Sequence, residues 1–146
     1  MFLSKSFGYA MRGVLFLAMD ANRSRKIQAE EIASALAIPR HFLAKIMKKM
    51  AEEGIVDSTK GPYGGFSINH RTLRTKLIDI FRITDGKYQF NECVLGFRKC
   101  NQDRPCPLHA HMVKLRNDML KNFTTTSIRD IAGSKDDNFI RSIAAR

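Results

Sequence analysis

Apolar residues recur at intervals of three and four along the first third of the chain, and this spacing predicts three helices. The first, over residues 3–20, is apolar on more than one side, so we expect it at the centre of the fold. The second covers residues 29–38 and has acidic residues in its first turn, where the helix dipole favours them. The third has Pro39 in its first turn and closes at Gly54.

The third helix has one apolar face and one basic face. Its apolar stripe, which we expect to face the core, consists of Leu43, Ile46, Met47 and Met50. Its opposite face carries Arg40, His41, Lys45, Lys48 and Lys49. Two short helices, a tight turn and a basic second helix are typical of a helix-turn-helix, in which the second helix reads DNA. Many other helical proteins contain such a pair, so the pattern is only moderately specific.

The next segment predicts a β-hairpin. Residues 55–56 and 66–68 are expected to form two short strands, joined by the loop KGPYGG, whose glycines and proline favour a turn. A hairpin directly after a basic helix is typical of the wing of a winged helix. Lys60 and Tyr63 in the loop are then expected to contact DNA. The alternative is a plain surface hairpin.

Two more helices are predicted in the second half of the chain. One covers residues 72–86, with Thr72 as its cap and Gly86 at its end. The other covers residues 107–123 and has an apolar stripe of Leu108, Met112, Leu115, Met119 and Phe123. That stripe could fold back on the core of its own chain, or it could pair with its counterpart in a second subunit.

The charge balance indicates a polyanionic partner. The 146 residues include 25 Lys and Arg against 14 Asp and Glu, a net charge of +11, and nucleic acid is the commonest partner of so basic a protein. Arg12 interrupts the apolar run near the start, and the chain has no uninterrupted run of about 18 apolar residues, the length that crosses a membrane. The sequence therefore predicts a cytoplasmic protein, in which thiols stay reduced and grouped cysteines suggest metal before disulfide.

All three cysteines lie in one polar loop, CVLGFRKCNQDRPCPLHAH. Cys93, Cys100, Cys106 and His109 make a complete set of four metal ligands within 17 residues. Pro107 is the expected first residue of the long helix, so His109 should project from the same face as Cys106. His111 points about a third of a turn away, and we therefore favour His109 as the fourth ligand.

The spacing of these ligands favours an iron–sulfur cluster. Structural zinc sites usually contain paired cysteines two to four residues apart, and this loop has no such pair. Longer and uneven gaps suit a wider group, and thiolates are the ligands that hold iron–sulfur clusters. A single zinc ion and reactive thiols without metal remain the alternatives.

The winged helix with KGPYGGF in its hairpin, followed by the cysteine loop with CPLH and a long helix, resembles one family of bacterial regulators. This is the family of the iron–sulfur cluster regulator IscR and the nitric-oxide-sensitive repressor NsrR. The resemblance runs over about residues 1 to 130, from SKSFGYAMR onward. It implies a homodimer with a long crossed dimer helix, two DNA-reading winged helices, and one cluster per subunit that controls operator binding.

The resemblance also implies roles for single residues. Cys93, Cys100 and Cys106 match the thiolate ligands, and His109 matches the histidine ligand of the cluster regulator. The residues that fall where the family meets DNA are Arg40, His41, Lys45 and, in the wing, Lys60. The chain departs from the family at two places. The first gap between cysteines is six residues instead of the common five, and Gly8 stands where the nitric-oxide sensors have an aspartate ligand.

We therefore predict a mostly α-helical fold with a small β-hairpin wing, in three parts. These are a winged helix-turn-helix domain over residues 1–86, a cysteine-rich loop over 87–106, and a dimerisation helix with a C-terminal tail over 107–146. Leu108, Met112, Leu115 and Met119 are the expected dimer contacts, and Lys48 joins the expected DNA contacts.

The predicted function is a DNA-binding transcription regulator, a repressor, that senses redox state, nitric oxide or iron–sulfur status through a 2Fe–2S or 4Fe–4S cluster. Its expected partners are a roughly palindromic DNA operator and a second copy of itself. One alternative is a winged-helix DNA binder with structural zinc or a metal-free thiol switch. Another is an iron–sulfur electron carrier or enzyme, but the chain contains no nucleophile elbow or Gly-rich cofactor motif, so we expect no enzyme.

Overall fold

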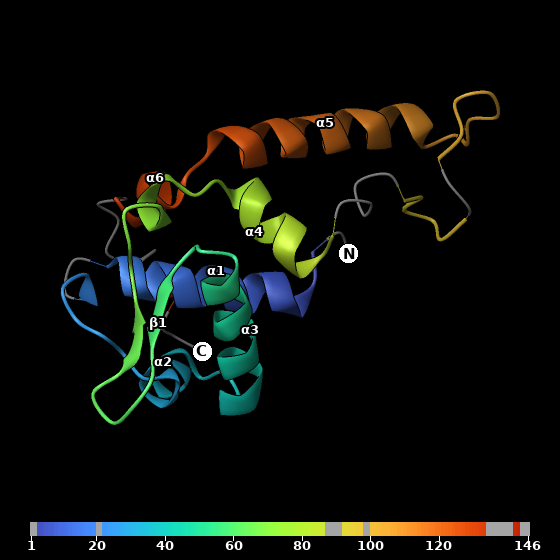
Figure 1. The fold of residues 1–146 in the computed structure, drawn as a ribbon. Coiled ribbons are helices and arrows are strands. Elements are labelled where there is room, and N and C mark those ends of the chain that lie inside the picture. The colour runs from blue at the N-terminus through green and yellow to red at the C-terminus, as the bar shows by residue number, and fades with distance from the viewer. Residues whose placement is uncertain (1–2, 20–21, 87–91, 98–99, 134–141, 144–146) are drawn as a thin grey trace.

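The computed structural model describes residues 3–19, 22–86, 92–97, 100–133 and 142–143. These residues are mostly helical, with a two-stranded antiparallel hairpin, which confirms the predicted fold class. The long helix α5 lies along one side of the molecule, and the hairpin tip and the start of α3 lie at the opposite end (Figure 1). None of the helices in the described ranges is both long and apolar enough to cross a membrane.

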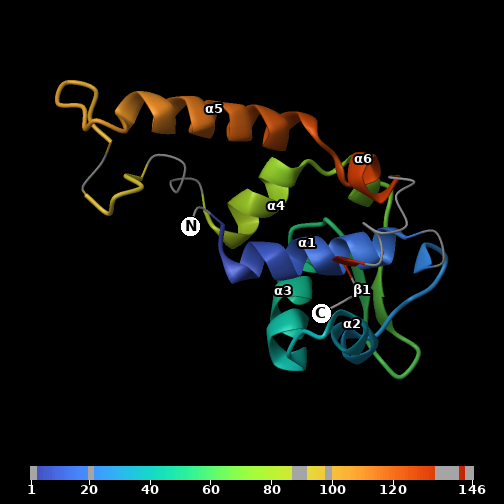
Figure 2. The ribbon, with the colours of Figure 1, turned by 180° about the vertical axis from the view of Figure 1, so that it is seen from behind.

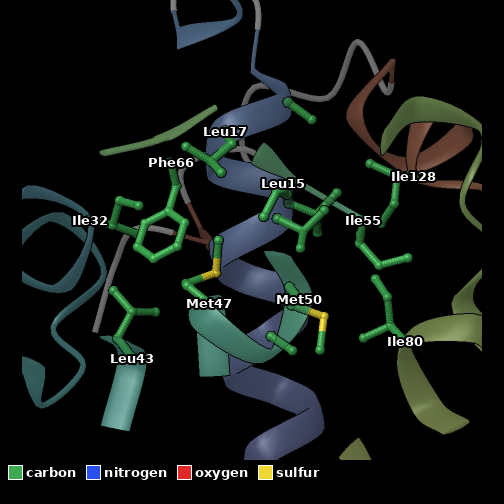
Figure 3. Close-up of a cluster of buried hydrophobic side chains, with 14 of the residues drawn as sticks. Leu15, Leu17, Ile32, Leu43, Met47, Met50, Ile55, Phe66, Ile80 and Ile128 are labelled. Atoms are coloured by element: carbon green, nitrogen blue, oxygen red, sulfur yellow. The ribbon is translucent and has the colours of Figure 1, made fainter. Parts of the chain in front are cut away.

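The first helix, α1 (Lys5–Ala18), is the centre of the fold, as its apolar sequence predicts. Ser4 caps it by accepting a hydrogen bond from the Phe7 backbone N–H at 3.1 Å. The helix packs against four others, α2 (Ala29–Leu36), α3 (Arg40–Glu52), α4 (Leu77–Thr84) and α6 (Ile128–Ala132). Buried side chains from these helices and from the hairpin surround it (Figure 3).

Helices α2 (Ala29–Leu36) and α3 (Arg40–Glu52) form the predicted helix-turn-helix. Pro39 is the N-cap of α3, one residue before the first turn in which the sequence predicted it. The predicted apolar stripe does face the core, because Leu43, Met47 and Met50 are fully buried. Helices α1 and α3 approach closely: a Cβ atom on Gly13 would lie only 2.6 Å from the Met47 sulfur.

The hairpin consists of β1 (Asp57–Thr59) and β2 (Gly65–Ser67), with Ser58 opposite Phe66. The prediction of the first strand was wrong by two residues, because Ile55 and Val56 are buried in the core and precede β1. Ile27 pairs with the other edge of β2: its backbone exchanges two hydrogen bonds of 2.8 Å with Phe66. The hairpin is therefore tied to the chain just before α2.

The predicted helix over 72–86 is two elements in the structure, a 3-10 turn at Thr72–Arg74 and α4 (Leu77–Thr84). Thr72 is not the cap of α4. It is buried, and its hydroxyl donates a 2.7 Å hydrogen bond to the carbonyl oxygen of Ile55. The start of α4 lies at Lys76, whose backbone N–H donates to the Asp79 carboxylate at 3.1 Å.

Helix α5 (His109–Thr125) begins two residues after Pro107, later than the sequence predicted, and has no buried residue. The short helix α6 (Ile128–Ala132) follows and packs against α1, with Ile128 fully buried. The chain after α5 thus returns to the core of the winged helix. Ile143 is buried in the same core, while most of the predicted C-terminal tail lies outside the described residues.

Candidate functional site

The exposed face of α3 is the first part of the candidate site. Core packing of the apolar stripe turns the opposite face outward, so all five of its predicted basic residues are exposed: Arg40, His41, Lys45, Lys48 and Lys49. The first turn of α3 contains no acidic residue, and no side chain caps its free N–H groups. The positive end of the helix dipole therefore adds to the side-chain charges at this end.

The loop between β1 and β2 is the second part. Lys60 and Tyr63 are exposed there, and Tyr63 exposes 93% of its surface. The loop is held from one side by Gln28, the N-cap residue of α2, whose side-chain amide donates a 3.1 Å hydrogen bond to the Pro62 carbonyl oxygen. The loop tip and the first turn of α3 lie at the same end of the molecule (Figure 1).

Two glycines make the turn of the hairpin possible. A Cβ on Gly64 would lie 2.0 Å from the Thr59 carbonyl oxygen. Gly65 has a φ of +138°, and a Cβ there would lie 2.6 Å from the Ile27 carbonyl group. Because backbone occupies both spaces, side chains are excluded at these positions, and the sequence GG fixes how closely β2 approaches Ile27.

The cysteine loop is the third part, at the start of α5 and far from the tip of the hairpin (Figure 2). All three cysteines are free and half-buried. The Cys100 sulfur lies 3.1 Å from Nδ1 of His109, the first residue of α5. The structure thus brings together two of the four predicted metal ligands. His111, the histidine that the sequence disfavoured, is exposed.

Backbone contacts place the other two predicted ligands differently, Cys106 next to His109 and Cys93 near the Arg116 side chain. The Cys106 carbonyl oxygen accepts a 2.9 Å hydrogen bond from the His109 N–H. The carbonyl of Glu92, next to Cys93, accepts a 3.3 Å hydrogen bond from Arg116, seven residues after His109 and about 10 Å farther along α5. Cys93 is therefore held beside a later turn. Within the described ranges no three His, Cys, Asp or Glu side chains gather in a metal-binding arrangement.

The chemistry of the four donors fits an iron–sulfur cluster. Thiolates hold iron–sulfur clusters and imidazoles replace some of them in certain sites, and one cysteine–histidine pair of this set is in contact, Cys100 with His109. Cys93 and Cys106 are joined to Cys100 by short segments, VLGFRK with Gly96 and the polar NQDRP. Whether the four residues bind one group stays a prediction.

The outer face of α5 is the fourth part. Leu108 and Leu115 expose 43% and 49% of their surface, and Met112 and Met119 are half-buried. Phe123, the last residue of the predicted stripe, instead turns to the core and stacks on Phe7 with ring centroids 5.5 Å apart. The single chain thus covers the stripe only in part.

Sequence reasoning missed two residues of the site. Gln28 gave no signal, because its partner is a backbone carbonyl 34 residues away. Phe42 is half exposed on α3 and lies against His41, with ring centroids 4.1 Å apart. Its apolar character next to Leu43 resembles that of a core residue, although its position outside the i, i+3, i+4, i+7 stripe could have identified it.

A family model matches almost the whole chain. It is Rrf2, described as an iron-dependent transcriptional regulator, and it matches residues 3–134. A relative in Aquifex aeolicus, described as an HTH-type transcriptional regulator, is 35% identical over 133 residues, which cover 90% of this chain and 91% of that one. These likenesses concern regulators of transcription and no enzymes.

Solved structures share the fold at low sequence identity. The global cysteine regulator CymR of B. subtilis has a TM-score of 0.72 at 19% identity, and the match covers 92% of this chain and 98% of that one. IscR of T. potens has a TM-score of 0.70 at 14% identity, with coverage of 93% and 89%. At such identities these two structures support the fold alone.

Gly65→Ala should disrupt the hairpin far more than Gly61→Ala does. Both glycines have a positive φ, +138° and +102°, so both variants strain the backbone, by about 1–2 kcal/mol. Only at Gly65 does the added Cβ also collide with the Ile27 backbone. We expect faster amide exchange at Phe66 for Gly65→Ala alone, and a larger loss of unfolding free energy for Gly65→Ala than for Gly61→Ala. Equal effects of the two variants would contradict the steric role of Gly65.

Proposed function

This chain belongs to the Rrf2 family of transcriptional regulators, and on that premise we propose that it is a homodimeric repressor whose operator binding an iron–sulfur cluster controls. DNA-binding regulation is the family's function. The finer parts of the proposal concern the residues that meet DNA, the ligands of the cluster, the dimer contact and the cytoplasmic location. The contact between Cys100 and His109 at the start of α5 is the observation that carries the sensing part.

The DNA-binding part of the proposal rests on the exposed face of α3 and on the hairpin loop. Helix-turn-helix proteins place the second helix in the major groove, with its first residues at the base edges. Arg40 and His41 begin α3, and Lys45 and Lys48 follow on its exposed face. Lys60 and Tyr63 lie on the hairpin loop at the same end of the molecule and would meet the backbone beside the groove.

The sensing part of the proposal assigns Cys93, Cys100, Cys106 and His109 as the ligands. When bound, the cluster would supply metal–ligand bonds that respond to oxidation, to nitric oxide and to loss of iron. His109 is the first residue of α5, so any partner of its imidazole fixes the position of that helix end. The backbone hydrogen bond between His109 and Cys106 ties the loop to the same turn.

Packed side chains connect the opposite end of α5, about 20 Å from His109, to α1 and from α1 to α3, and a straight helix would transmit a shift from one of its ends to the other. Phe123 near the end of α5 contacts Phe7 of α1 and Phe81 of α4. Farther along α1, Gly13 lies directly against Met47 of α3. A shift at the start of α5 would therefore move the surface on which α3 rests. In this proposal α3 can occupy two positions, and these contacts transmit the state of the cysteine loop to α3, so that one position is favoured over the other.

The dimer part of the proposal rests on the partly uncovered stripe of α5. A helix of 17 residues without a buried side chain has little to stabilise it in water, because isolated helices of this length are marginal. A second copy offers the same stripe. A two-fold axis would place the stripe of one subunit, Leu108, Met112, Leu115 and Met119, against the same four residues of the other. Such a dimer also presents two α3 helices to a palindromic site.

Replacing Lys60 with Ala should weaken binding to every DNA duplex. One phosphate contact fewer should reduce the slope of log K against log salt by about one unit. Lys121→Ala, an equal change of charge on α5, is the control and should leave the slope unchanged. Fluorescence anisotropy at several salt concentrations measures both. A variant with Arg40, Lys45 and Lys60 all changed to Ala that binds like the parent would overturn the DNA-binding part of the proposal.

Replacing His109 with Ala should give protein that forms a cluster but loses it quickly, because the ligand set then lacks its fourth donor. Cys106→Ala should give none, and His111→Ala, a matched change two residues away on an exposed position, should behave like the parent. Visible absorbance and iron analysis after anaerobic reconstitution distinguish these results. Stoichiometric zinc without visible colour in the parent would show that the loop holds zinc instead.

Replacing Leu115 and Met119 with Glu should produce monomers. Two carboxylates in an apolar interface lose their hydration without gaining partners, which costs several kcal/mol. Asn117→Glu, on the opposite side of α5, is the control and should stay dimeric. Sedimentation velocity gives the oligomeric state. A double variant that remains dimeric would mean that another surface holds the two subunits.

A further inference from the structure

Phe42 is an exposed aromatic residue on α3 for which the packing of the chain gives no reason. Among the large apolar side chains that the structure describes as exposed, Phe42 is the one that belongs to α3, and it exposes 50% of its surface. It precedes the fully buried Leu43, and successive residues of a helix are turned by about 100°. The ring is therefore directed outside the inward stripe and is absent from the core cluster.

The ring is held in place on the surface. Its centroid lies 4.1 Å from that of the His41 ring, with an angle of 39° between the planes. A phenylalanine side chain has only two rotatable bonds, so this contact leaves it little freedom to lose when a ligand binds. Phe42 is the third residue of α3, in the turn from which recognition helices contact base edges.

The surroundings of the ring restrict what could cover it. Exposed cationic side chains lie on the same side of α3, among them Lys45 and Lys49, three and seven residues after Phe42. An apolar protein surface would have to desolvate these charges, whereas a polyanion would pair with them. The ligand must therefore be polyanionic and must also present a small apolar group beside its phosphates.

We propose that Phe42 contacts the C5-methyl group of a thymine in the major groove and so specifies thymine at one position of each half-site. The thymine methyl is the apolar group that the bases expose in that groove, and Phe is one of the side chains that contact it. Double-stranded RNA offers no equivalent, because uracil lacks the methyl and its major groove is too narrow to enter. The inference rests on the proposed DNA binding and adds a determinant of sequence preference to it.

Replacing thymine with uracil removes only the methyl group and tests this contact directly. Duplexes that bind the purified full-length protein are first selected from random sequences. Each thymine of the selected site is then changed to uracil. We expect one position per half-site at which uracil weakens binding about fourfold, the effect of one buried methyl group. Phe42→Ala should abolish that difference, and Phe42→Leu should retain part of it.

Lys45→Ala is the matched control on the same helix. It should weaken binding to both duplexes and keep the full ratio between thymine and uracil. Because the ring lies outside the core cluster, Phe42→Ala is expected to unfold at the same denaturant concentration as the parent.

Two results would overturn the inference and leave the proposed function standing. In the first, the parent protein binds the selected site equally well whichever thymine is replaced by uracil, a result that is obtained without any variant. The other is a Phe42→Ala variant that retains the uracil penalties of the parent. If the parent selects no duplex from the random pool, the proposed DNA binding itself fails, and the inference falls with it.

Discussion

Contact among three phenylalanine rings joins the helix that carries the cysteine loop to the core that carries α3. Phe7, Phe81 and Phe123 come from α1, α4 and α5, with ring centroids 5.5 to 6.1 Å apart. Helix α5 has no buried residue, so this cluster and its contact with α4 determine how the helix is oriented. Each aromatic pair contributes about 0.5–1.5 kcal/mol beyond the area it buries. This free energy is large enough to favour one orientation of α5. It is also small enough that, in our proposal, ligation at the other end of α5 can change the orientation.

The two ends of the molecule face opposite chemical demands. The end formed by α3 and the hairpin must hold cationic side chains rigidly, and it does so through buried apolar residues, two glycines without room for a side chain, and the hydrogen bond from Gln28. Among the described residues, the end formed by the cysteine loop is held by a few hydrogen bonds, among them the one from Arg116 to the Glu92 carbonyl, and by the Cys100–His109 contact. In our proposal the rigid end reads DNA, and the lightly held end responds to the signal.

Periodicity predicted most of the helices of this fold, because most of them bury a regular apolar stripe. It placed α1, α2 and the inward face of α3 correctly. It was wrong where a residue's role depends on a distant partner. Ile55 and Val56 were predicted as a strand but are buried in the core. Thr72 was predicted as a helix cap, but its hydroxyl donates a hydrogen bond to the Ile55 carbonyl oxygen. The grouping of the cysteines identified their loop as a candidate site, and the position of Phe42 outside the apolar stripe could have identified that residue. Gln28 could not be recognised, because its partner is the Pro62 carbonyl 34 residues away.

The coupling between the loop and α3 is tested most directly by operator affinity with and without the cluster. Anaerobically loaded protein and the same preparation stripped of iron are titrated against the selected operator and against an unrelated duplex at one salt concentration. We predict a large change in operator affinity and a small change for the unrelated duplex, because in our proposal ligation moves α3 and leaves the surface charge near the phosphates in place. Equal operator affinity of loaded and stripped protein would contradict the coupling.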